Sequence, residues 1–237
     1  MANQFNRTEL LLGKENMEKL KKARVLIFGI GGVGGYVVEA LARSGIYHFT
    51  LVDNDVISET NINRQIIATL ENIGEDKVEA MKKRILSINR DAEVEIRKYF
   101  YLPETADQFD FSKYDYVVDC VDTVSAKLSI IVEAKKNNVP VISAMGAGNK
   151  LNPAMLEIAD ISKTSVDPLA KVIRTELRKR GINHLKVVYS KEQPIKIDDP
   201  NVELKEKSQR PVPGSNAFVP SAMGLIMASE IIKDLLI

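Results

Sequence analysis

The sequence predicts an α/β fold in which helices cover both faces of a doubly wound, mostly parallel sheet. Short apolar segments that suit strands alternate with longer segments that suit helices. The strand segments are apolar along their whole length, as expected when helices cover both faces of a sheet. A glycine-rich run, GIGGVGG at 29–35, joins the first of these strands to a helix. These observations together indicate parallel βαβ units.

The expected elements follow in chain order. A short helix over 9–22 comes first. The alternating part has strands at 25–28, 49–52, 94–97, 116–121 and 139–144, with helices at 33–44, 76–88 and 125–137. Two further strands, 156–161 and 185–189, flank a helix at 168–180. Residues 190–216 carry four prolines and little periodicity, so we expect a long, mobile loop before a closing apolar helix at 219–235.

The length and composition suit one domain. The 237 residues are 45% hydrophobic, enough for one well-filled core. We therefore expect a single domain over 1–237, with a nucleotide-binding core over about 1–150 and a substrate-facing C-terminal elaboration over about 151–237. The 33 basic and 32 acidic residues nearly cancel, so any surface for a nucleic acid has to be a local patch.

The single cysteine excludes an intramolecular disulfide and an all-cysteine zinc site. The N-terminal MANQFNRTELL lacks the long apolar core of a signal peptide. No run approaches the roughly 20 apolar residues that span a bilayer. We therefore expect a soluble cytoplasmic protein with no membrane span.

The glycine run has the context of a nucleotide site. It lies between an expected strand and an expected helix, whose N-terminus offers oriented N–H groups to an anion. Gly29, Gly31 and Gly32 permit the close approach of backbone to phosphate. Asp53 ends the next strand, where a carboxylate can bind ribose hydroxyls. The glycines alone do not distinguish a redox dinucleotide from another nucleotide, or either from a tight turn without a ligand.

The residues after Asp53 favour ATP. The segment DNDVISETNINRQ at 53–65 is followed by Lys77 at the start of an expected helix, where a cation opposes the helix macrodipole and suits a nearby anion. An Asn and an Arg near a triphosphate can orient the α-phosphate and neutralise a departing pyrophosphate. Taken singly, Arg64 and Lys77 fit solvated surface charges equally well. The residues that together favour ATP cleavage are Asp55, Asn61, Arg64, Gln65 and Lys77.

Asp122 lies just past the carboxyl end of an expected strand, where ligands bind in open α/β sheets. A carboxylate there suits Mg²⁺, which takes one or two carboxylates together with phosphate oxygens. The alternative is that Asp122 caps the helix that begins near 123–125.

The glycine run, the D-x-D at 53–55, the N-x-x-R-Q at 61–65 and the Asp122 of DCVDT resemble the E1-like adenylating family, which has a Rossmann-like ATP-binding fold. That family includes the activating enzymes of molybdopterin and thiamin biosynthesis. The resemblance implies a homodimer that uses ATP and Mg²⁺ to convert a carboxylate into an acyl-adenylate.

The resemblance also implies roles for individual residues. Gly31 and Gly32 would lie along the ATP phosphates, Asp53 would bind the ribose, and Lys77 would contact the phosphates. Asp122 would hold Mg²⁺ or position the carboxylate under attack. The residues with implied catalytic roles are Arg7, an N-terminal arginine that would reach the phosphates, Arg64, which is commonly donated across the dimer interface, Lys77 and Asp122.

Two features of the family are missing. Members that activate sulfur-carrier proteins commonly hold zinc with paired C-x-x-C motifs, and ubiquitin-type members form a thioester on a cysteine. Cys120, the single cysteine, falls inside the expected strand YVVDCV and is most simply a buried apolar residue.

The C-terminal third resembles one branch of the family, the tRNA threonylcarbamoyladenosine dehydratases. The similar runs are AMGAGNKLNP at 144–153, KTSVDPLAKVIR at 163–174, VVYSKEQP at 187–194 and GSNAFVPSAMG at 214–224. This resemblance implies that the carboxylate of a threonylcarbamoyl group on tRNA is adenylated. An internal nucleophile then closes a ring and expels AMP, so no enzyme nucleophile is needed.

A basic stripe agrees with an RNA partner. Lys171, Arg174 and Arg178 recur at i, i+3 and i+7 and so share one face of the expected helix. Such a stripe can contact RNA phosphates, although a solvated helix face explains it equally well. Further contacts are expected from the 190–216 loop, through Lys205, Lys207 and Arg210.

The leading interpretation is therefore ATP-dependent cyclisation of threonylcarbamoyladenosine in tRNA. The nearest alternative is an adenylyltransferase for a ubiquitin-like sulfur-carrier protein, which the missing zinc cysteines disfavour. An NAD-dependent oxidoreductase would leave Arg7, Asn61, Arg64 and Lys77 without a role. A noncatalytic nucleotide-binding scaffold, and a sulfur-transfer or redox protein as a partner, also stay open.

Overall fold

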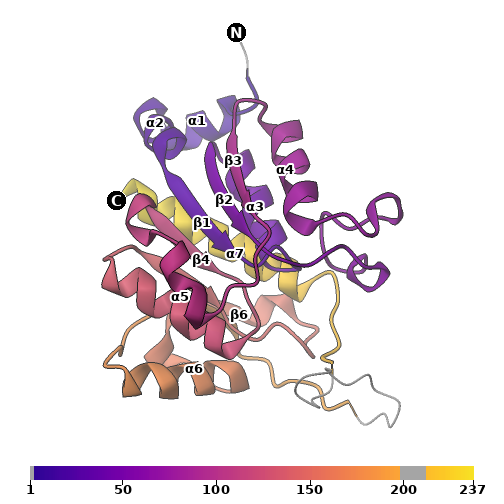
Figure 1. The fold of residues 1–237 in the computed structure, drawn as a ribbon, viewed down its shortest axis with the longest axis vertical. Coiled ribbons are helices and arrows are strands. Elements are labelled where there is room, and N and C mark those ends of the chain that lie inside the picture. Colours follow the sequence, from indigo (N-terminus) through magenta and orange to yellow (C-terminus); the bar gives the residue numbers. More distant parts are fainter. Residues whose placement is uncertain (1–2, 198–211) are drawn as a thin grey trace.

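Seven strands form one sheet in the order β3-β2-β1-β4-β5-β7-β6 (Figure 1). The computed structural model describes residues 3–197 and 212–237. Neighbouring strands are parallel except for β6, which runs antiparallel to β7. The predicted doubly wound, mostly parallel sheet is confirmed. The strands are β1 (Arg24–Phe28), β2 (His48–Val52), β3 (Glu93–Arg97), β4 (Tyr116–Asp119), β5 (Val141–Ala144), β6 (Leu156–Asp160) and β7 (Lys186–Ser190).

Helices cover both faces of the sheet, with α5 in front of the strands in Figure 1 and α7 behind them. The strands supply alternate residues to two cores: Val25 and Ile27 pack on the α3, α4 and α7 side, whereas Leu26 and Phe28 pack on the α5 and α6 side. The helices are α1 (Asn6–Leu12), α2 (Lys14–Lys22), α3 (Gly34–Arg43), α4 (Lys77–Ile88), α5 (Val124–Lys136), α6 (Pro168–Lys179) and α7 (Val219–Leu236).

The strand order reverses between β1 and β4. From β1 the chain adds β2 and β3 on one side, and from β4 it adds β5, β7 and β6 on the other. The loops after β1 and β4 therefore leave the same edge of the sheet in opposite directions. That divergence is where open α/β sheets bind their ligands.

Two expected elements differ from the structure, and a third lies mostly outside the described residues. The predicted helix at 9–22 is two helices, because Gly13 has a φ of +80° and separates α1 from α2. The strand expected at 116–121 ends at Asp119, so Cys120 lies just beyond β4. Most of the loop expected at 190–216, including Lys205, Lys207 and Arg210, lies outside the described residues.

None of the helices in the described part of the chain combines the length and the apolarity that crossing a membrane requires.

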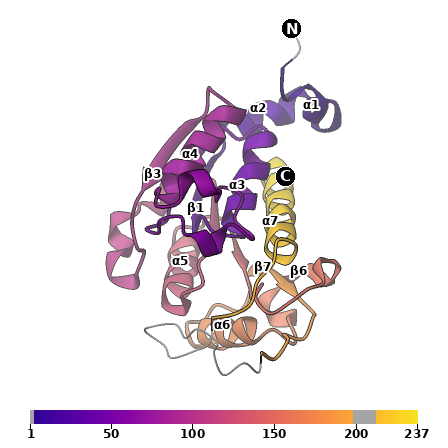
Figure 2. The ribbon, with the colours of Figure 1, turned by 90° about the vertical axis from the view of Figure 1, so that its right-hand side faces the viewer.

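Helix α7 packs closely along α3, and Figure 2 shows the two helices side by side. Gly224 makes this approach possible. A Cβ atom at Gly224 would lie 2.4 Å from the carbonyl oxygen of Val33 and 2.9 Å from the Cβ of Tyr36. Since Val33 directly precedes α3, this contact ties α7 to the helix that follows the glycine run.

We expect Gly224→Ala to destabilise the protein by about 1–3 kcal/mol, because one of the two helices has to move to admit the new methyl group. Thermal unfolding followed by circular dichroism measures the change. Ser229→Ala, on an exposed position of the same helix, is the matched control and should change stability by less than about 0.5 kcal/mol. Equal stability of the two variants would contradict the close packing of α7 on α3.

Candidate nucleotide-binding site

Two glycines of the 29–35 run are required by the protein's own packing. Gly29 has a φ of +86°, and a Cβ atom there would lie 2.8 Å from the carbonyl oxygen of Cys120. A Cβ atom at Gly34 would lie 1.8 Å from the carbonyl oxygen of Gly29. The absence of side chains lets the start of α3 close onto the end of β1, next to the loop after β4. The N-terminus of α3 therefore lies beside both loops, and a helix N-terminus is a place where anions bind.

Gly31 is different, because nothing in the protein requires a glycine there. Its φ is not in the left-handed region, and the nearest atom to an added Cβ would be Nε2 of Gln65, at 3.8 Å. The backbone at Gly31 is thus open on the side that faces Gln65. Open glycine backbone beside a helix N-terminus is what the close approach of a phosphate requires.

The carboxylate of Asp53 is hydrogen-bonded to the backbone of the glycine loop. Its Oδ2 accepts a hydrogen bond from the Ile30 N–H at 2.6 Å, and its Oδ1 accepts one from the Asp55 N–H at 2.9 Å. Burial raises the pKa of Asp53, while the positive charge of Lys77 opposes that shift. Each carboxylate oxygen keeps a further lone pair, so the predicted contact with ribose hydroxyls remains chemically available.

Lys77 is the first residue of α4, and its side chain is only 7% exposed. Its Nζ lies 2.7 Å from Oδ2 of Asp55, whose backbone carbonyl also accepts the Lys77 N–H. The sequence predicted that an anion lies beside Lys77. The carboxylate of Asp55 is such an anion, so the protein itself supplies part of the negative charge. Asp55 fixes the ammonium group near Asp53, at the edge of the sheet where the glycine loop lies.

The N-x-x-R-Q segment forms a tight turn beside the loop. Asn61 is buried, and its Oδ1 accepts the Ser58 N–H at 3.1 Å, so it shapes the turn. The Arg64 side chain packs against the glycine loop of its own chain, because its Cγ lies 3.3 Å from where a Cβ of Gly32 would lie. Its Nη1 donates to the carbonyl oxygen of Thr60 at 2.9 Å. Burial lowers the pKa of Arg64, although the guanidinium stays charged at neutral pH.

Gln65 carries an unsatisfied acceptor. The residue is 6% exposed, and its Oε1 is buried with no hydrogen-bond partner among the described residues. Leaving a buried polar atom unpaired costs about 1–3 kcal/mol. The atom of Gln65 on the side of Gly31 is Nε2, so a ligand at the open face of Gly31 would meet the amide nitrogen, which is a donor.

Asp122 lies on the loop that packs against Gly29, and it is exposed. The N-cap of α5 is Thr123, so the residue at the capping position is the neighbour of Asp122. In the described ranges, no three His, Cys, Asp or Glu side chains come together as a metal site. An ion at Asp122 would therefore need oxygen ligands from the nucleotide, as the preference of Mg²⁺ for phosphate oxygens allows.

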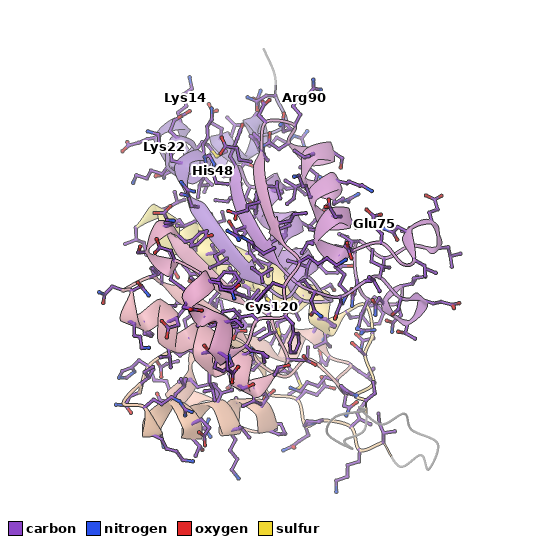
Figure 3. All side chains as sticks on the ribbon, in the orientation of Figure 1. Lys14, Lys22, His48, Glu75, Arg90 and Cys120 are labelled. Carbon is purple, nitrogen blue, oxygen red and sulfur yellow. The ribbon has the colours of Figure 1, made fainter. Side chains whose placement is uncertain are left out.

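Cys120 directly follows β4, and its label is near the middle of the view in Figure 3. It is half-buried and not fully buried as expected, because it follows the end of β4. Burial raises its pKa far above the usual range of a thiol. The thiolate that thioester chemistry needs is therefore strongly disfavoured.

Arg7 is not brought to the site by its own chain. It lies exposed on α1, and both Figure 1 and Figure 2 show α1 at the end of the molecule where the strands begin. The glycine loop lies at the opposite edge of the sheet, after β1. A single chain therefore cannot place Arg7 on phosphates bound at this loop.

Only part of the basic stripe of α6 is available to bind a phosphate. Lys171 and Arg178 are exposed. Arg174 is half-buried, and its Nη1 donates to the carbonyl oxygens of Thr164 at 3.1 Å and Ile161 at 3.4 Å. Arg174 thus ties α6 to the turn after β6, and the surface available to a phosphate is reduced to the other two side chains.

The C-terminal segment 212–220 lies against the glycine loop and the turn that contains Asn63. The sequence did not lead us to expect this segment at the site. Pro220 has its Cβ 3.4 Å from where a Cβ of Gly32 would lie, and the carbonyl oxygen of Ser215 accepts Asn63 Nδ2 at 3.0 Å. Asn216 donates to the carbonyl oxygen of Lys150 at 2.6 Å. The run GSNAFVPSAMG was the available signal, but contacts this distant in sequence leave no local pattern.

The fold and these contacts are those of an α/β protein whose candidate nucleotide-binding site lies at the switch point of the sheet. The ThiF family model matches residues 4–236, and the chain belongs to the ThiF family. The tRNA threonylcarbamoyladenosine dehydratase of Bacillus subtilis is 47% identical over 243 residues, which cover 100% of this chain and 96% of that protein.

Two further relatives place the chain within that family. The E. coli tRNA N6-threonylcarbamoyladenosine dehydratase TcdA, in its complex with ATP, superposes with a TM-score of 0.88 at 31% identity, over 98% of this chain and 93% of that one. The adenylyltransferase and sulfurtransferase UBA4 of Vanderwaltozyma polyspora is 34% identical over 139 residues, which are 58% of this chain and 31% of that protein.

We expect Gly31→Ala to lower ATP affinity by about tenfold or more while leaving the melting temperature unchanged, because the new methyl group points into space that only a ligand would occupy. Calorimetric titration and thermal unfolding measure the two effects. Gly34→Ala is the contrasting variant: its methyl group meets the Gly29 carbonyl, so it should destabilise the fold by about 3 kcal/mol. Unaltered ATP binding by Gly31→Ala would show that phosphates do not pass over this loop.

Proposed function

We propose that the chain uses ATP to adenylate the carboxylate of N6-threonylcarbamoyladenosine in tRNA, and that the adenylate then cyclises with loss of AMP. The observation that carries the proposal is the place of the C-terminal runs in the structure. The segments that resemble the dehydratase branch, 144–153 and 214–224, hold each other through Asn216 and Lys150. The second segment also lines the glycine loop through Pro220. The part of the chain that resembles the dehydratases therefore lies beside the proposed nucleotide site.

The reaction proceeds in two steps. A carboxylate oxygen attacks the α-phosphorus of ATP, the bond to the β-phosphate oxygen breaks, and pyrophosphate leaves. A nucleophilic atom within the same threonylcarbamoyl group then attacks the activated carbonyl carbon and expels AMP, which keeps the original carboxylate oxygen. The nucleoside loses the elements of water, and ATP becomes AMP and pyrophosphate. No enzyme thiolate is required, in agreement with the raised pKa of Cys120.

The residues around the loop take the corresponding roles. The open backbone at Gly31 and the N-terminus of α3 receive the phosphates, with the amide nitrogen of Gln65 beside Gly31, and Asp53 receives the ribose hydroxyls. Lys77 and Arg64 offset the charge that develops on the departing pyrophosphate. Asp122 is the residue that would hold Mg²⁺, and the ion would neutralise phosphate charge.

The alternative substrate is the C-terminus of a ubiquitin-like sulfur-carrier protein. The partial similarity to an adenylyltransferase and sulfurtransferase is the observation in its favour. It leaves the contacts of the 212–220 segment without a role, since those contacts lie in the part of the chain that resembles the dehydratases.

Incubating the protein with ATP and bulk tRNA that carries threonylcarbamoyladenosine should lower the mass of that nucleoside by one water. Liquid chromatography and mass spectrometry of digested tRNA measure the change. Lys77→Ala is the matched control and should abolish the mass change while leaving circular dichroism unaltered. Unchanged nucleoside mass with protein that binds ATP would refute the proposed function. Pyrophosphate exchange that requires a sulfur-carrier protein would support the alternative.

We also propose that the working unit is a homodimer. Helix α7 is rich in apolar residues, and Phe218 at its N-cap and Leu225, seven residues further on, are 61% and 49% exposed. Leu10 and Leu11 on α1 are each 86% exposed. Exposed apolar patches commonly mark surfaces that associate, and a second copy of the chain would cover these side chains. In such a dimer, Arg7 would reach the phosphates held by the partner chain.

Mixing Arg7→Ala with Lys77→Ala tests this arrangement. Each variant alone should be inactive. Mixed dimers contain one site with both residues intact, so the mixture should recover roughly a quarter of wild-type turnover if the chains pair at random in a closed dimer. Absence of recovery in a mixture that exchanges subunits would show that Arg7 acts within its own chain or not at all.

The tRNA would lie against the C-terminal half of the protein. Lys171, in the first turn of α6, and Arg178, in the last, are the exposed cations of the stripe. Contacts of this kind bind phosphates without reading sequence and weaken with salt. A tRNA substrate also agrees with the cytoplasmic location expected from the sequence.

A further inference from the structure

A polar cluster lies under the end of β4, in an otherwise apolar interior. Lys127 of α5, Asp119 of β4 and Ser143 of β5 are each 0% exposed. Lys127 belongs to the apolar face of α5, between Ala126 and Leu128 and close to Ile131. None of the three lies at the surface of the site, so none can contact the nucleotide directly.

The cluster is fully hydrogen-bonded. Nζ of Lys127 donates to Oδ2 of Asp119 at 2.7 Å, to Oγ of Ser143 at 3.2 Å and to the carbonyl oxygen of Ala144 at 2.9 Å. The Ser143 hydroxyl donates to the same Oδ2 at 2.5 Å. Three elements, α5, β4 and β5, are thereby joined at one ammonium group.

The cluster is also hydrogen-bonded to the loop that carries Asp122. The second oxygen of Asp119, Oδ1, accepts the Val121 N–H at 3.2 Å. Val121 is the residue before Asp122, and its nitrogen lies 3.1 Å from where a Cβ of Gly29 would be. The same carboxylate thus bonds the buried lysine on one side and the loop between β4 and α5 on the other.

Stability alone is a weak reason for such a cluster. Moving a carboxylate and an ammonium group out of water costs several kcal/mol per ion, and replacing a buried ion pair with apolar residues of similar volume is often neutral or stabilising. The apolar neighbours of Lys127 would accept such a replacement. The directional hydrogen bonds of the ion pair fix the position of the Asp119 side chain. Through Asp119 they also fix the position of the loop that follows β4.

We propose that Lys127 is a positioning residue: through Asp119 and Ser143 it holds the loop that places Asp122 at the reacting phosphate, and it supports turnover while leaving ATP affinity almost unaltered. The inference rests on the proposed adenylation. It assigns Lys127 no contact with substrate.

The test removes the ions without leaving one of them unpaired. The triple variant Lys127→Met, Asp119→Val and Ser143→Ala replaces the cluster with apolar side chains. We expect a melting temperature equal to or above that of the wild type and an ATP dissociation constant within twofold of it. Turnover should fall by about a hundredfold, the loss typical of a misplaced catalytic group. Hydrogen exchange at the Val121 amide should accelerate, while that at Val117 and Val118 stays slow.

Two further variants make the test specific. Lys127→Arg keeps a charged donor on α5 and should recover part of the turnover that Lys127→Met loses. Tyr116→Phe is the control on the same strand, because Tyr116 Oη donates to Oδ2 of Asp234 at 2.6 Å at the other end of β4. It should leave turnover and Val121 exchange unchanged. If the triple variant fails to fold, Ser143→Ala alone should show a smaller change in the same two quantities.

Wild-type turnover by a folded triple variant would overturn the proposal, as would unaltered exchange at Val121. Loss of ATP affinity in proportion to turnover would also overturn it, because the cluster would then support the whole site. Failure of the proposed function is a separate result: it appears as the absence of nucleoside dehydration by the wild-type protein, whereas ATP binding and Val121 exchange are measured without tRNA.

Discussion

The structure depends on the close approach of backbone at the start of α3. The carbonyl of Gly29 lies where a side chain on Gly34 would have to be, and Gly29 itself fits against the Cys120 carbonyl only because it lacks a Cβ. This approach brings the N-terminus of α3 to the reversal point of the sheet, between the loops that follow β1 and β4. Helix α7 is tied to the same point through Gly224, so the C-terminal segment reaches the site as well.

The charges around this point are arranged for a ligand with both phosphates and hydroxyl groups. Lys77 is held by Asp55, and Asp53 is held by two backbone N–H groups, so neither has to reorganise when the nucleotide binds. Preorganised groups of this kind stabilise developing charge without further cost at the moment of reaction. Arg7 lies at the other end of the chain's own sheet, and we propose that a second chain completes the site.

The fold followed from the sequence because its signals are local. The apolar central strands, the glycine run and the helix between 33 and 44 each depend on neighbouring residues, and the sheet confirmed them. The two edge strands, β3 and β6, are not apolar along their whole length as expected, because an edge strand is only partly covered. The break at Gly13 was missed because one glycine is often tolerated in a helix. The candidate site residues from Asp53 to Lys77 lie within one stretch of chain, so they were predicted together. Arg174 was assigned to RNA although it binds Thr164, and Lys127 was not assigned at all. Both depend on contacts across the fold, although a lysine on the apolar face of α5 was a signal in the sequence.

The central claim is that a carboxylate oxygen attacks the α-phosphorus of ATP at this loop. Labelling both carboxylate oxygens of the threonylcarbamoyl group in tRNA with ¹⁸O follows that oxygen directly. We expect mass spectrometry to find one ¹⁸O atom in each AMP released and one retained in the cyclised nucleoside. Unlabelled AMP, or label in inorganic phosphate, would contradict it, because the carboxylate would then have been activated by phosphorylation or not activated at all.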